Sequence, residues 1–183
     1  MKTACVVLNC IVLACIACGC LSVERKEYYY QLNADGESGK GTVTFVNIFS
    51  NGDDSATVAK DFAELVNDYV GGVKVDSLYP DVSDIHKRLY ESSGKLNGEV
   101  SFTFSHLTQA LLYRYDAQSP VMQYLDMINE KYMNSNGKFG GSHMPVMFWK
   151  NTAHDLTLST EVAEDTGSAH SLLPEYTGWQ KNH

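Results

Sequence analysis

Cysteine is missing from most of this 183-residue chain, because all five cysteines lie within the first twenty positions. The following 163 residues can therefore hold no disulfide framework, no cysteine-based metal site and no cysteine nucleophile. Basic residues are also scarce: only Lys2 of the 14 lysines and arginines precedes residue 20, which leaves 13 basic against 22 acidic side chains and a net charge of −9. Since nucleic-acid binding depends on Lys and Arg neutralising phosphates, this charge argues against nucleic acid as a partner.

Catalytic signatures are lacking as well. The sequence has no Walker loop, no Gly-x-Gly-x-x-Gly and no Gly-x-Ser-x-Gly. Its six histidines show no metal-ligand spacing, and the Asp53-Asp54 pair is too short a motif for a calcium loop. The glycine-rich segment 35–41 joins two expected strands, so it lacks the helix N-terminus that would hold a phosphate. We expect no catalytic residues, no metal and no cofactor. If the chain is an enzyme, His106, His143 and His154 are the first candidates.

The N-terminus carries the most specific pattern in the chain. Met1-Lys2 is a short positive segment, and residues 4–17 are apolar apart from Asn9. That run is shorter than the roughly 20 residues that span a bilayer, and it has the size of the apolar part of a signal peptide. It ends in Ala17-Cys18-Gly19-Cys20, which resembles the lipobox of bacterial lipoproteins.

The resemblance implies an export signal over residues 1–19, an acylated Cys20 and a short tether over 20–27. Cys15 and Cys18 offer competing positions for the lipid. Cys20 is favoured because a glycine precedes it and polar sequence follows closely. The alternative is an ordinary secretory signal without a lipid.

The residue after the expected anchor is Leu21 rather than aspartate. In enteric-type bacteria this implies the outer membrane. The soluble part, residues 28–183, is then one domain held to the cell envelope by its lipid anchor.

Alternating or β-branched runs predict strands over residues 28–32, 42–49, 73–79, 99–104, 146–149 and 156–162. The first two runs are expected to form a hairpin around the turn at 35–41. In the first, Tyr28 and Tyr30 should face one way and Tyr29 the other. The tyrosines are interpreted mainly as cover over the sheet, with a binding face as the alternative.

Helical spacing predicts four further segments. Val58, Phe62, Leu65 and Tyr69 form a stripe that begins at Asp54 or Ser55 and ends at Gly71-Gly72. A second helix is expected over residues 82–92, and a third after Ser105. The fourth should start at Ser119-Pro120 and carry a stripe of Val121, Leu125, Ile128 and Tyr132. The last twenty residues are expected to be irregular, held by Leu172, Tyr176 and Trp179.

Together these segments predict a single α+β domain, a mixed and mostly antiparallel sheet with helices packed on one face. With an anchor and no catalytic motif, the expected function is a non-enzymatic binding or assembly component of the envelope. Its expected partners are the membrane, through the lipid, and another envelope protein. The alternative is a hydrolase-like envelope enzyme whose site is assembled from dispersed residues.

Overall fold

The structure is a computed structural model and describes residues 21–163, 167 and 169–182. Its strands are β1 (Leu21–Leu32), β2 (Gly39–Ser50), β3 (Ser83–Ser92), β4 (Lys95–Phe104), β5 (Val121–Tyr124), β6 (Lys131–Ser135), β7 (Lys138–Phe139), β8 (Val146–Trp149), β9 (Asp155–Glu161) and β10 (His170–Ser171). Its helices are α1 (Ser55–Glu64), the π-helix η1 (Leu65–Val70), the 3-10 helices η2 (Asp76–Leu78) and η3 (Leu107–Ala110), and α2 (Leu173–Gln180). Within this part of the chain, no helix has the length and apolar character needed to span a membrane.

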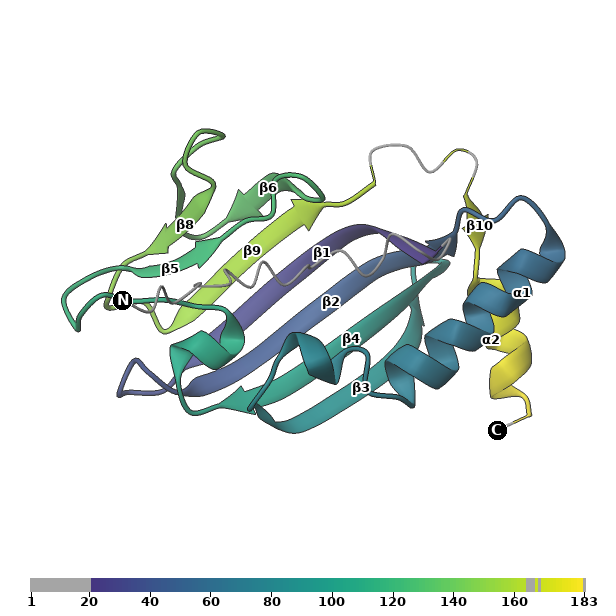
Figure 1. Cartoon of the computed structure of the whole chain (residues 1–183), viewed down its shortest axis with the longest axis horizontal. Coiled ribbons are helices and arrows are strands. Elements are labelled where there is room, and N and C mark those ends of the chain that lie inside the picture. The colour runs from purple at the N-terminus through teal and green to yellow at the C-terminus, as the bar shows by residue number, and fades with distance from the viewer. Residues whose placement is uncertain (1–20, 164–166, 168, 183) are drawn as a thin grey trace, which may run out of the picture.

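Two antiparallel sheets form the framework. The large sheet has the order β3-β4-β2-β1-β9-β6, with β10 added beside β2, and the small sheet has the order β5-β8-β7. Figure 1 shows the large sheet as a twisted, elongated layer, with β5 and β8 at one end and α1 and α2 at the other. The prediction of a single, mostly antiparallel α+β domain is confirmed.

The core has two adjoining clusters of buried side chains. One joins the large sheet to the small sheet through residues that include Val100, Phe102, Met147 and Trp149. The other joins β1, β2 and β4 to α1, η1 and α2, and it contains Phe62, Leu65, Leu96, Leu172 and Tyr176. Phe45 and Tyr69 pack against both clusters, so apolar contact continues along the sheet.

The long helical segment forms for the reasons that its sequence predicts. Asp54 is the N-cap of α1, and its carboxylate accepts hydrogen bonds from the N–H groups of Ala56 and Thr57 at 2.8 and 2.9 Å. These bonds lower the pKa of Asp54, since they favour the charged form. The final turn differs from the prediction, because Leu65–Val70 widens into the π-helix η1 before the chain leaves at Gly71.

Several predicted elements are wrong. Residues 82–92 form strand β3 rather than a helix, and the segment after Ser119 forms β5, a loop and β6. The segment after Ser105 gives only the short η3, and 73–79 is a turn with η2 rather than a strand. In contrast to the expected irregular end, α2 forms between Leu173 and Gln180. The strand β1 begins at Leu21, so most of the expected tether belongs to the sheet.

The tyrosine-rich strand follows its predicted phase. Tyr30 is 1% exposed and Tyr28 lies on the same side of β1, where it packs against the core. Tyr29 points to the opposite side and is 40% exposed.

Candidate functional site

Most of the exposed apolar side chains come from one stretch of the chain. Among the described residues, eight large hydrophobic side chains are exposed, and six of them lie between residues 113 and 144. These six are Tyr113, Tyr115, Tyr124, Ile128, Met133 and Met144. This segment includes β5, β6 and β7, and its exposed surface is therefore the first candidate for a contact with another molecule.

The register of the small sheet places several of these side chains in neighbouring rows. Tyr113 pairs with Met122 and Met122 with Phe148, while Tyr124 pairs with Val146. Because paired residues project from the same side of an antiparallel sheet, these five side chains share one side, which we call the outer face of the small sheet. Tyr113 is 49% exposed and Tyr124 is 65% exposed, and the other three are half-buried.

The other side of the small sheet is its contact with the core. Val121 and Met147 are completely buried and Trp149 is 2% exposed, all within the cluster that joins the two sheets. An antiparallel sheet with one solvated side normally alternates apolar with polar residues. Here the outer side of β5 and β8 is apolar, and the core side is apolar apart from the buried Gln123, a pattern close to that of strands covered on both sides.

The outer face is built on a rigid support. Trp149 Nε1 donates a hydrogen bond to Asn136 Oδ1 at 2.9 Å, and a Cβ on Gly137 would lie only 2.7 Å from the Trp149 ring. The N–H of Leu125 donates to the carbonyl of Pro145 at 2.8 Å, just beyond the paired ends of β5 and β8. These contacts hold the small sheet in place in the unbound protein, so less conformational entropy is lost when a partner binds.

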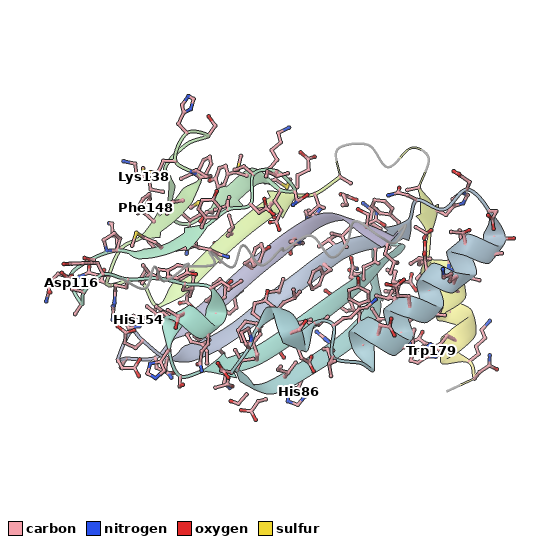
Figure 2. All side chains as sticks on the ribbon, in the orientation of Figure 1. His86, Asp116, Lys138, Phe148, His154 and Trp179 are labelled. Atoms are coloured by element: carbon pink, nitrogen blue, oxygen red, sulfur yellow. The ribbon has the colours of Figure 1, made fainter. Side chains whose placement is uncertain are left out.

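Charged side chains border this end of the molecule. Lys138 pairs with Phe148 across β7 and β8, and Figure 2 shows both at the same end as Asp116. The Asp116 carboxylate accepts three hydrogen bonds, from Gln118 N–H and from the N–H and hydroxyl of Ser119. The bonds from Ser119 contribute most to lowering the pKa of Asp116, and this carboxylate therefore stays ionised. An apolar centre with a polar rim is the arrangement seen in protein–protein interfaces.

A shallow polar groove on the large sheet is the second candidate. It has a volume of about 270 Å³, and its walls include Tyr29, Thr42, Thr44, Thr157 and Ser159. The Tyr29 hydroxyl donates to Asp155 at 2.6 Å, a bond that raises the pKa of Tyr29. The lining consists mostly of residues with hydroxyl or amide side chains, with Glu27 as its carboxylate, so the groove resembles an ordinary solvated sheet face.

A buried carboxylate on the opposite side of the large sheet has a structural role. Glu130 is 7% exposed and accepts bonds from Lys26 Nζ (2.6 Å), Thr160 Oγ1 (2.6 Å) and Tyr28 OH (3.1 and 3.2 Å). All of these donors lie on β1 or β9, so the network ties the start of β6 to the sheet. Burial, and secondly the Glu130 charge, raise the pKa of Tyr28 well above its ordinary value, and the phenol therefore remains a donor.

The histidines do not form a site within the described residues. His86 lies on a strand and His106 is the N-cap of η3, whereas helices were expected to hold both. His143 and His154 are exposed and share no hydrogen bond or ion pair. The part of the chain that the structure describes contains no group of three potential metal ligands.

One serine and one carboxylate come together without forming a catalytic triad. Ser50 Oγ donates to Asp61 Oδ2 at 2.5 Å and accepts the N–H of Gly52 at 2.9 Å, and both side chains are buried. His170 pairs with Ser50 across β10 and β2, but its exposed ring makes no hydrogen bond to either residue. A serine nucleophile needs its base within hydrogen-bond reach, so we interpret this contact as a tie between β2 and α1.

The expected lipid site, Cys20, lies outside the described residues, as do Cys15 and Cys18. Comparison of the chain with protein-family models, curated proteins and solved structures gave no match. The candidate site therefore depends on its own geometry. In the sequence, the run Tyr28–Tyr30 stands out among the tyrosines, whereas Tyr113 and Tyr124 do not. The available signal for the outer face was the run Val-Met-Phe-Trp in β8, in which every residue is apolar and neither side of the strand is polar.

Proposed function

We propose that this chain is a lipid-anchored component of a bacterial cell envelope that binds another protein through the outer face of the small sheet. The observation that carries the proposal is the apolar character of the outer side of β5 and β8, which the core does not cover. Tyr and Met, which supply five of the six exposed side chains between residues 113 and 144, are enriched in protein interfaces. No enzymatic step is needed for this function.

The position of the outer face also fits a tethered protein. Leu21, directly after the expected anchor, pairs with Ser50 at the end of the large sheet that contacts α1 and α2. The small sheet packs near the other end of β1, where Gln123 Nε2 donates to Tyr30 OH at 3.3 Å. A twelve-residue strand is roughly 35–40 Å long. The outer face is therefore held away from the anchored end, as Figure 1 illustrates.

We further infer that the helices pack on one face of the large sheet. In support, the inward residues Leu96, Val100 and Phe102 alternate along β4, which puts their side chains on one side of it. Leu96 contacts the helical cluster, and the other two contact the cluster that includes the small sheet.

Site-specific photocrosslinking in intact cells tests the binding function. A photoreactive amino acid placed at Tyr124 or Tyr113 should capture one defined protein, because both side chains stand on the outer face. The same amino acid at Val73, which is 74% exposed in the turn after η1, is the matched control and should capture nothing specific. Equal capture from all three positions, or no capture from Tyr124 and Tyr113, would refute the proposal. Capture of a second copy of this chain would replace it with self-association.

The anchor is tested separately. Cys20→Ser should abolish labelling by radioactive palmitate and move the chain from the membrane fraction to the soluble fraction. If the variant remains labelled, the lipid is on Cys15 or Cys18. If the unmodified protein takes up no palmitate but is exported, the chain carries an ordinary secretory signal.

A further inference from the structure

An apolar cleft lies between η1 and the large sheet. Its volume is about 80 Å³, and its wall is formed almost entirely by carbon atoms from β1, β2, β3, β4 and η1. The side chains that define it include Val23, Phe45, Ile48, Tyr69, Val70 and Leu89. Phe45, Tyr69, Val70 and Leu89 are only half-buried, so the cleft reaches the surface along them.

Two local features keep this space open. Gly98 lies on β4 opposite Phe45 and Leu89, and a Cβ at this position would already approach Ile48 Cδ1 to 3.0 Å. Across the cleft, the π-helical turn carries a hydrogen bond from Gly71 N–H to the Val66 carbonyl, five residues back, at 2.8 Å. Such widened turns are rare and often occur at functional sites.

The two cationic residues in the lining, Lys87 and Arg88, are already engaged, and Arg88 donates two hydrogen bonds to Glu99, both at 2.9 Å. Lys87 Nζ donates to the Gly72 carbonyl at 2.6 Å and to Asp76 at 2.8 Å. The Lys87 ammonium group is thereby held beside the turn that follows η1, away from an apolar occupant. Since a small apolar cavity is a poor site for water, which needs polar partners, the chemistry favours a hydrocarbon.

The location of the cleft indicates the source of that hydrocarbon. Leu21 and Val23 line it, and Leu21 is the first described residue and the one that follows the expected acylated Cys20. On the proposed function, this end of the domain is the one beside the bilayer. An engineered cavity of about 150 Å³ holds one benzene molecule, so about half that volume suits only a few carbon atoms.

We propose that this cleft binds the methyl end of a lipid acyl chain drawn from the adjoining membrane. The inference rests on the proposed anchor for the source of the lipid, and on the cleft alone for its chemistry. Val70 stands at the mouth and Gly98 forms part of the floor, so enlarging either side chain should exclude the ligand.

The test uses the full chain in phosphatidylcholine vesicles that contain palmitic acid with a diazirine at its methyl end. After photolysis, mass spectrometry should locate adducts on the cleft residues Tyr69, Val70 or Leu89. Val70→Phe and Gly98→Leu should each abolish these adducts. Val73→Phe, a substitution of the same type three residues outside the cleft, should keep them. If Gly98→Leu does not fold, as judged by circular dichroism, Val70→Phe and Val73→Phe still provide the comparison.

Three outcomes would overturn the proposal: no adduct on the cleft, adducts that persist in Val70→Phe, or adducts that appear only when Cys20→Ser removes the chain's own lipid. The last result would mean that the anchor itself fills the cleft. If Cys20→Ser does not release the chain from the membrane, the proposed anchor is contradicted but the proposed lipid cleft is not. The two results are separable because the adducts on the cleft are located by a different measurement.

Discussion

Removal of the Phe102 ring should strongly destabilise the domain. This side chain is 2% exposed, stacks on Tyr79 with ring centroids 4.6 Å apart and lies 6.4 Å from the ring of Phe104. A Cβ built on Gly41 would lie 2.5 Å from the Phe102 ring, so the ring rests directly on the backbone of β2. Glycine offers no side chain that could move into the space left by Phe102→Ala.

The magnitude follows from this packing. Replacement of a buried Phe by Ala costs about 3–5 kcal/mol, and the cost rises when the cavity cannot collapse. The lost aromatic pair adds about 0.5–1.5 kcal/mol. We therefore expect the free energy of unfolding to fall by about 4–5 kcal/mol, out of the roughly 5–15 kcal/mol that stabilises a typical domain. At about 2–4 °C per kcal/mol for a chain of this size, the melting temperature should fall by roughly 10–20 °C.

Urea unfolding of the Cys20→Ser form, followed by circular dichroism, measures this change. The control is Thr103→Ala, one residue along β4, whose side chain points to the other side of the sheet. It should change the free energy of unfolding by less than about 0.5 kcal/mol. A harmless Phe102→Ala together with a damaging Thr103→Ala would mean that the phase of β4 is inverted, and the core described above would be wrong.

Three further results are expected. Glu130→Ala should lower the free energy of unfolding by about 3–5 kcal/mol, because it leaves the nearly buried Lys26 ammonium without its partner. The double variant Lys26→Met/Glu130→Leu should recover much of this stability in the same urea assay. An equal loss of stability in the single and the double variant would contradict this explanation. The added methyl group of Gly137→Ala should press on the Trp149 ring, lower the free energy of unfolding by about 1–3 kcal/mol and reduce crosslinking from Tyr124. Unchanged crosslinking would show that the small sheet tolerates the displacement of Trp149. Hydrogen bonds from Ser38 and Glu37 lower the pKa of Asp35 from 3.8 to about 2. The contribution of Asp35 to stability should therefore be complete above pH 4 and be lost as the pH falls towards 2. Asp35→Asn should lack this pH-dependent contribution in acid unfolding, and identical unfolding profiles for the unmodified protein and the variant would exclude it.

Local sequence determined the elements in which one periodicity dominates. In β4, Val100, Phe102 and Phe104 alternate with small polar residues, a pattern that no helix would bury efficiently. The α1 stripe has helical spacing and a carboxylate at its start, and the same residues cap and bury it in the structure. The cysteine distribution and the lipobox-like segment Ala17-Cys18-Gly19-Cys20 are likewise properties of the sequence alone.

The wrong predictions share a physical cause. Val82, Ile85 and Leu89 have helical spacing, yet Ile85, Lys87 and Leu89 also alternate, so both periods fit the same residues. Pairing with β4 selected the strand, because that contact satisfies the backbone and lets the half-buried Ile85 and Leu89 pack against the core clusters. The segment after Ser119 is similar: β5 forms by pairing with β8, and Ile128, an expected core residue, is 93% exposed in a loop.

The candidate site belongs to this second group. Tyr113, Met122, Tyr124, Val146 and Phe148 are spread over 36 positions, and nothing in their local sequence indicates that they share a face. Their arrangement depends on the register between β5 and β8, which is set by the burial of Val121, Met147 and Trp149 in the core. Sequence by itself thus determined the expected anchor and the strongly periodic elements, since these depend on neighbours along the chain. Only tertiary structure decided which apolar side chains were left uncovered, because burial depends on contacts between distant segments.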